Sequence, residues 1–130
     1  MDCRAPFLTV LLSLTVLAGC STQPVSTITH FFDRNGEALL KQGIKDYEGA
    51  RFTDASENLD EALDAGLGTN DQVTAHKYLA FIACRAKHQR QCRAHFKIAL
   101  ELDPGFELAP AEAANPVWGP VFRAAKEGRR

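Results

Sequence analysis

The chain has 130 residues, a formal net charge of −1 and 45% hydrophobic residues. This composition is ordinary for a globular protein, and the length suggests one small domain. Acidic and basic residues nearly balance, so the chain has no net positive charge that would attract a nucleic acid, and we expect no nucleic-acid partner.

An apolar run from Ala5 to Ala18 is followed by Gly19 and Cys20. The run has the length of a signal-peptide core and is shorter than the roughly 20 residues of a transmembrane helix. Its ending, Leu-Ala-Gly-Cys20, matches a bacterial lipobox, although an ordinary N-terminal core helix is the alternative. We therefore expect residues 1–19 to be removed between Gly19 and Cys20, and Cys20 to carry the lipid anchor. Ser21, where Asp would favour the inner membrane, predicts an outer-membrane anchor facing the periplasm.

The mature chain begins with polar and helix-breaking residues, so residues 20–34 are predicted to be the lipidated cysteine and a flexible tether, with the tether reaching about Phe32. Beyond it, apolar residues recur with a helical period and potential caps follow each run. These patterns predict helices over residues 36–51, 53–66, 71–88 and 91–102. Because no segment has a convincing strand period, the expected fold class is all-α.

A pattern of small, large apolar and small residues repeats after 37 residues: Ala55, Leu59 and Ala62 recur as Cys92, Phe96 and Ala99. It resembles the tetratricopeptide repeat (TPR), a helix-turn-helix unit of about 34 residues. Pro104 takes the terminal proline of the second copy, and a longer loop at residues 66–70 accounts for the wider spacing of the first. The resemblance implies two TPR-like repeats over residues 35–104.

The tail after the repeats, residues 105–130, is predicted to be a capping segment with a last helix. Asn115 and Pro116 suit an N-cap and a first-turn proline, and apolar residues then recur at helical spacing. Repeat arrays leave a bare hydrophobic face at the last unit, which a capping helix covers. We expect Trp118 and Phe122 to cover that face. Direct contact of Trp118 with a partner is the alternative.

Two cysteines, Cys84 and Cys92, remain after the leader is removed and Cys20 is lipidated. They fall on either side of the predicted turn between the third and fourth helices, and we predict a disulfide between them. Two buried free thiols are one alternative, and a metal site with His88 and His95 is another. The spacing is not a standard zinc framework, so we predict no metal and no cofactor beyond the lipid.

The sequence offers no motif for catalysis. It has no Gly-x-Ser-x-Gly elbow and no phosphate-binding glycine loop, and its paired acids fall on solvated helix faces. We therefore expect a non-enzyme without a small-molecule substrate. Acidic residues concentrate in the stretch 45–64 and basic residues in the stretch 85–97. The two stretches could simply attract each other, or they could steer a partner of opposite pattern.

TPR arrays bind peptides or protein domains on a concave face that is lined by the first helix of each repeat. In this chain that face predicts a partner-binding groove at Tyr47, Lys77, Phe81 and Arg85.

Three segments carry a more specific resemblance: Ala80–Cys84, Gln91–Arg93 and, above all, the tail Leu102–Phe122. Together with the lipobox and the repeats, they resemble the TssQ family of lipoproteins associated with type VI secretion. The resemblance implies a periplasmic, non-catalytic adaptor accessory to the secretion membrane complex, whose components would be its protein partners. The alternative is a pilotin-like chaperone or an envelope-assembly scaffold for an outer-membrane protein.

Overall fold

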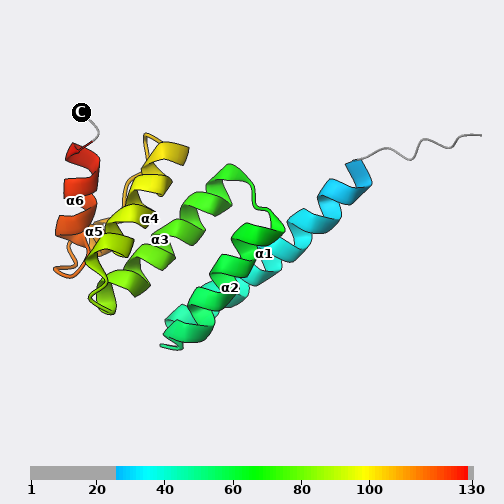
Figure 1. The fold of residues 1–130 in the computed structure, drawn as a ribbon, viewed down its shortest axis with the longest axis horizontal. Coiled ribbons are helices and arrows are strands. Elements are labelled where there is room, and N and C mark those ends of the chain that lie inside the picture. Colours follow the sequence, from blue (N-terminus) through cyan, green and yellow to red (C-terminus); the bar gives the residue numbers. More distant parts are fainter. Residues whose placement is uncertain (1–25, 129–130) are drawn as a thin grey trace, which may run out of the picture.

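The computed structural model describes residues 26–128, with side chains from Asn35 onward. Within this range the chain forms helices and no strand, which confirms the all-α prediction. The helices are α1 (Ser26–Glu48), α2 (Phe52–Ala65), α3 (Thr69–Arg85), α4 (Gln89–Leu102), α5 (Pro110–Ala113) and α6 (Gly119–Glu127) (Figure 1). The expected leader and its processing site, Gly19 and Cys20, lie outside the described residues. No helix in the described range is long and apolar enough to cross a membrane.

The four long helices form two hairpins, α1 with α2 and α3 with α4, and α3 joins them by packing against α2 (Figure 1). The repeated small positions lie where the helices cross, and Ala55, Ala62, Cys92 and Ala99 are fully buried. At Gly43, a Cβ atom would come within 2.8 Å of Leu59 Cγ. The close approach of α1 to α2 thus requires the small residue there. The predicted TPR-like arrangement is confirmed.

Helix α1 begins at Ser26, so the prediction of a tether as far as Phe32 was wrong for residues 26–32. The polar residues suggested a tether, but no proline or glycine interrupts the sequence between Ser26 and Asn35. Polar and β-branched residues lower helix propensity only slightly, so they do not stop a helix that continues into a packed segment.

The C-terminal helix also begins later than predicted. Asn115 does not cap it directly: its Oδ1 atom accepts a hydrogen bond from the backbone N–H of Val117 at 2.8 Å, in a tight turn. Helix α6 then starts at Gly119, with Pro120 in its first turn. An asparagine followed by proline suits such a turn as well as an N-cap, and the sequence alone did not separate the two. The short helix α5 was not predicted.

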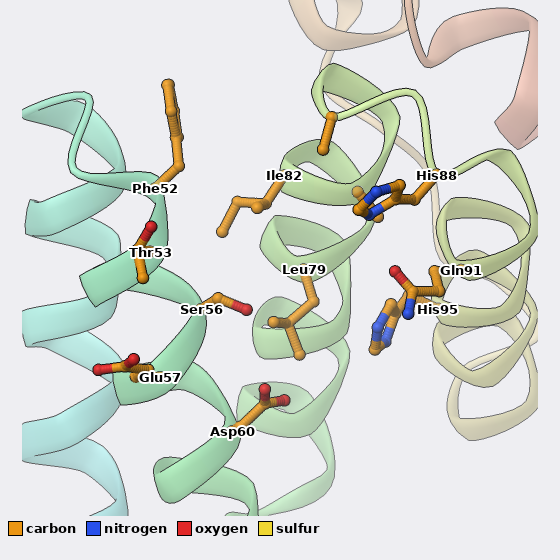
Figure 2. Close-up of a pocket in the computed structure, with 12 residues that line it drawn as sticks. Phe52, Thr53, Ser56, Glu57, Asp60, Leu79, Ile82, His88, Gln91 and His95 are labelled. Carbon is orange, nitrogen blue, oxygen red and sulfur yellow. The ribbon is translucent and has the colours of Figure 1, made fainter.

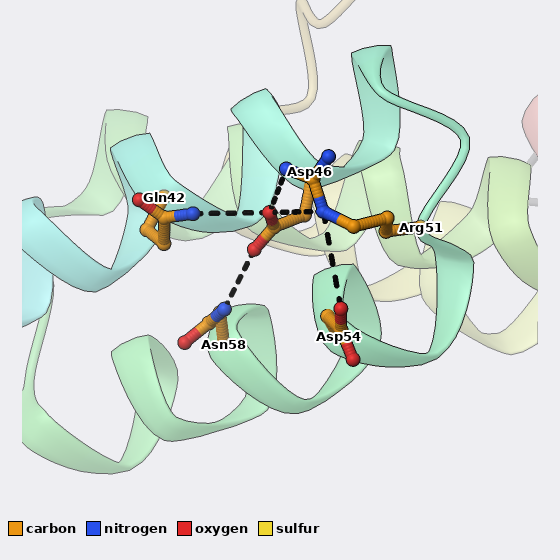
Figure 3. A network of polar contacts seen from close by, with 5 residues as sticks. All are labelled: Gln42, Asp46, Arg51, Asp54 and Asn58. Carbon is orange, nitrogen blue, oxygen red and sulfur yellow. Dashed lines mark hydrogen bonds and ion pairs between the residues drawn. The ribbon is translucent and has the colours of Figure 1, made fainter.

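The turn between α1 and α2 is built around a buried carboxylate, Asp46, which is only 3% exposed. Its oxygens accept hydrogen bonds from Gln42 Nε2 at 3.0 Å, Arg51 Nε at 3.0 Å and Asn58 Nδ2 at 2.8 Å (Figure 3). The Arg51 guanidinium is the main cause that lowers the pKa of Asp46. A second guanidinium nitrogen of Arg51 also pairs with the carboxylate. This network holds the end of α1 to the start of α2.

The capping prediction for Trp118 and Phe122 is confirmed by their burial, at 7% and 4% exposure. Helix α6 packs on α4 at the end of the stack opposite α1 (Figure 1). The Trp118 ring stacks on Phe81 with centroids 4.3 Å apart, and the Phe122 ring meets Phe96 edge-on at 5.3 Å. The outer side of α6 carries the exposed Arg123. A polar outer surface of this kind ends the array.

Candidate binding groove

Cys84 and Cys92 form a disulfide in the structure, with their Cα atoms 5.1 Å apart. The bond joins the last turn of α3 to the first turn of α4. Both sulfur atoms are engaged and buried, so the alternatives of free thiols and of a thiolate metal site do not apply to this structure. In the described part of the chain, no three His, Cys, Asp or Glu side chains are placed to hold a metal ion.

The groove predicted on the inner face is not open at its centre. Phe81 is only 2% exposed and lies beneath Trp118. Lys77 Nζ forms an ion pair with Glu112 Oε1 at 2.7 Å, and the Glu112 carbonyl oxygen accepts a hydrogen bond from Trp118 Nε1 at 2.9 Å. The prediction of Phe81 as a partner contact was therefore wrong, whereas that of Lys77, which is engaged by Glu112 in this structure, stays a prediction. Repeat phase placed both residues on the inner face but could not show that the C-terminal segment covers it.

The other two predicted groove residues have different surroundings. Tyr47 is partly buried, with its ring 5.1 Å from the Tyr78 ring and 5.6 Å from the Phe52 ring between centroids. Burial raises the pKa of the Tyr47 phenol. Arg85 is exposed at the end of α3, and its guanidinium carbon lies 4.5 Å from the centroid of the Phe52 ring. Of the four predicted residues, Arg85 alone is exposed.

An open groove lies between α2 and α4 and across α3 (Figure 2), and of the four predicted residues only Arg85 lines it. It consists of two adjoining cavities of about 490 Å³ and 670 Å³ that share Phe52, Ile82 and Ala86. We call it the outer groove. Leu79 and Ile82 of α3 give it an apolar floor, and Phe52 stands at its edge.

The two ends of the outer groove carry opposite charges. The first cavity is lined on the α2 side by Glu57 and Asp60 (Figure 2). The second cavity is lined by Arg85 and Lys87, together with Val117, whose side chain is 43% exposed. The cavities thus combine an apolar strip with an acidic end and a basic end, as a surface that binds a polypeptide segment does.

Two histidines cross-link α3 and α4 beside the acidic end. The Nδ1 atoms of His76 and His95 lie 3.0 Å apart, so one ring donates a hydrogen bond and the other accepts it. Burial lowers the pKa of His76 to about 4, and burial is also the main cause that lowers the pKa of His95. The charge of Asp60 acts in the opposite direction and raises the pKa of His95, while burial raises the pKa of Asp60 itself. Neutral imidazoles are therefore favoured at this contact.

Sequence reasoning missed the apolar part of the outer groove, at Phe52, Ile82 and Val117. The charge pattern was the available signal, because Asp60 belongs to the acidic stretch and Arg85 to the basic stretch. Those two stretches meet across this groove. The charge pattern of the sequence does not locate the groove, because only the packing of α2, α3 and α4 shows which face the acidic and basic stretches share.

Neither a protein-family model, nor a curated protein, nor a solved structure matches this chain. The structure defines the class as a small TPR-like helical protein, and no relative supplies its function.

Proposed function

We propose that this protein is a periplasmic adaptor, anchored to the outer membrane by lipid on Cys20, that binds other proteins without catalysing a reaction. The observation that carries the proposal is the outer groove, which is an open, partly apolar surface between the two helical hairpins. Helical repeats provide such surfaces to polypeptide partners, and the binding residues are positioned by helices that pack independently of the ligand.

Two features support a periplasmic location. The apolar run from Ala5 to Ala18 matches an export signal, and its ending Leu17–Cys20 matches a signal for lipid attachment. The Cys84–Cys92 disulfide belongs to the chemistry of oxidising compartments, because cytosolic thiols are generally kept reduced. Ser21 favours transfer to the outer membrane. The domain would then face the periplasm from the inner leaflet.

We further propose that the partners belong to the membrane complex of a type VI secretion system. The support is the resemblance of the segments around Cys84 and Cys92 and of the tail Leu102–Phe122 to the TssQ family. In the structure this tail forms the cap of the array, with Trp118 in the core. The tail residues that resemble the TssQ family thus pack mainly within the protein, and the partner is tested directly by crosslinking.

The test is crosslinking of the native, lipidated protein in intact cells, followed by purification and identification of the crosslinked proteins. We expect type VI membrane-complex components, and we expect them to be lost in a Cys20→Ala variant that is neither lipidated nor anchored. A Ser21→Ala variant, which keeps the lipid, is the matched control and should retain them. Recovery of the same proteins with Cys20→Ala would contradict a role for the anchor.

A pilotin-like chaperone or an envelope-assembly scaffold would give different results. Deletion of a chaperone changes where its outer-membrane client is found, whereas deletion of an adaptor lowers assembly of a correctly localised complex. Crosslinking to a secretin or to a barrel-assembly subunit, without secretion components, would overturn the type VI proposal and support one of these alternatives.

A further inference from the structure

We infer that the outer groove binds a polypeptide segment of its partner that places an acidic side chain next to a large apolar one. The acidic side chain would lie between Arg85 and Lys87, and the apolar one against Phe52, Ile82 and Val117. The inference rests on the proposed adaptor function and names the chemistry of the partner.

The basic end of the groove is available for a carboxylate. Among residues 35–128, the ion pairs involve Arg51, Lys77 and Lys126, and neither Arg85 nor Lys87 takes part in one. Contact with the Phe52 ring orients the Arg85 guanidinium at the groove edge. A guanidinium placed in this way binds a carboxylate with little further ordering of its side chain.

The apolar site lies next to these cations. Val117 is 43% exposed, and the other exposed large hydrophobic residue in the described range is Ile98, at 37%. Val117, Phe52 and Ile82 line the same cavity as Arg85 and Lys87. The disulfide partner Cys84 lines it too, which fixes the α3–α4 turn that carries Lys87. The apolar and acidic side chains of the segment must therefore be close neighbours.

The remainder of the groove favours a polypeptide over a membrane lipid. An anionic phosphate headgroup would suit Arg85 and Lys87 as a carboxylate does, but it offers no cationic group to the acidic wall at Glu57 and Asp60, whereas a polypeptide segment can place a basic side chain there. Polar side chains also line the two cavities and can hydrogen-bond to peptide groups: Thr53, Ser56, Gln89 and Gln91. A segment with a basic side chain at one end and an acidic side chain at the other matches the order of charges along the outer groove.

The first experiment selects random peptides displayed on phage against the full mature protein and measures their affinities by fluorescence anisotropy. We expect enriched peptides with Asp or Glu adjacent to Leu, Ile, Phe or Trp. An Arg85→Glu/Lys87→Glu variant should bind them roughly tenfold or more weakly, and a peptide with Lys in place of the acid should bind that variant better than it binds wild type.

Matched controls make the result specific. Arg93→Glu/Lys97→Glu changes the charge equally at exposed positions of α4 that line neither cavity, and it should bind as wild type does. Val117→Ser alters the apolar site at an exposed position without adding a charge beside the cations, and should also weaken binding. Enrichment without acidic residues, no enrichment, or equal affinity for wild type and Arg85→Glu/Lys87→Glu would overturn the inference. Stronger binding to anionic lipid vesicles than to the selected peptides would overturn it in favour of a lipid ligand.

A second experiment separates this inference from the proposed function. A photo-crosslinking amino acid is placed at Val117 or, as the control, at the exposed Ala124 of α6. One outcome is a crosslink from position 117 to a secretion component that is abolished by Arg85→Glu/Lys87→Glu. This result would support both the groove assignment and the adaptor function. Crosslinks to that component from position 124 alone would leave the adaptor standing and overturn the groove assignment. Crosslinks to no envelope protein from either position would contradict the adaptor itself.

Discussion

Trp118 shows how one side chain links the tail to the repeats. Its ring stacks on Phe81, and its indole N–H donates a hydrogen bond to the Glu112 carbonyl oxygen. The chain contains a single tryptophan, so its fluorescence reports this contact alone. The residue thus provides both an anchor for the cap and a probe of it.

We expect Trp118→Ala to lower the free energy of unfolding by about 3–5 kcal/mol, because it removes a large buried side chain and leaves a cavity over Phe81. Urea denaturation followed by circular dichroism measures the change. Val117→Ala is the control at the neighbouring, exposed position and should change stability by less than about 0.5 kcal/mol. An equal effect of the two substitutions would contradict the anchoring role of Trp118.

Asp46 is a buried carboxylate whose hydrogen bonds are all made by side chains of the first hairpin. Asp46→Asn keeps the shape but removes the charge that Arg51 pairs with, and we expect the Tm to fall by roughly 10 °C at neutral pH. Asp54→Asn is the control, since Asp54 is an exposed partner of the same Arg51 at 3.9 Å. A Tm of Asp46→Asn that matches the control would show that the network is dispensable.

The His76–His95 contact predicts a pH dependence of stability. The folded pKa of His76, about 4, lies below its ordinary value of 6.5, so the unfolded chain takes up the proton first as the pH falls. This contribution to stability is complete above pH 6.5 and is lost progressively toward pH 4. We expect the free energy of unfolding of wild type to fall over this range more steeply than that of His76→Gln. His88→Gln, at an exposed histidine, should follow wild type. Parallel curves for wild type and His76→Gln would refute the assignment.

At the scale of elements, each hairpin is held at its turn by a different device. Asp46 and its partners hold the turn from α1 to α2, whereas the Cys84–Cys92 disulfide holds the turn from α3 to α4. The second turn also carries Lys87 in the left-handed region, at φ 64°. A covalent link there fixes one end of the outer groove in a chain too small to have a large core.

Removal of the disulfide by Cys84→Ala/Cys92→Ala should lower the free energy of unfolding by about 2–3 kcal/mol, because the closed loop is short. Equilibrium denaturation with urea measures it, and wild type treated with a reductant should approach the variant. A thiol-reactive maleimide added after denaturation, which labels only reduced protein, checks the bond itself. Full labelling of the oxidised wild type at these two cysteines would contradict the bond.

At the scale of the whole molecule, α6 takes the place where the first helix of a third repeat would lie, against α4. The core cluster of the second hairpin is continuous with the tail, since Phe96 and Leu100 pack in one cluster with Leu108, Trp118 and Phe122. The tail thus completes the core of the second hairpin and closes the array.

Deletion of residues 106–130 should expose the apolar face of the second hairpin and abolish cooperative unfolding. Binding of a hydrophobic dye and loss of a sigmoidal thermal transition by circular dichroism measure this effect. Deletion of residues 129–130 alone is the control and should leave both unchanged. A truncated chain with the cooperativity and Tm of the full chain would show that the repeats need no cap.

The helical class and the two-repeat layout could be predicted from the sequence, and the disulfide between Cys84 and Cys92 was the favoured of three alternatives. These features depend on local periodicity, on small residues at helix crossings and on cysteines placed across a short turn. All three can be recognised from the order of residues along the chain. The apolar spacing of Trp118 and Phe122 likewise predicted a cap. The boundaries at Ser26 and Gly119 were misjudged, because polar residues near a helix end permit either continuation or a turn.

Which surface remains open depends on tertiary packing. Phe81 and Arg85 share a face of α3 by helical spacing, yet the folded-back tail buries the former and leaves the latter exposed. The acidic and basic stretches become neighbours only because α2 and α4 flank α3. Helical periodicity determines the direction in which a side chain leaves its helix. Whether another segment then buries that side chain depends on contacts between residues distant in sequence, such as Phe81 and Trp118.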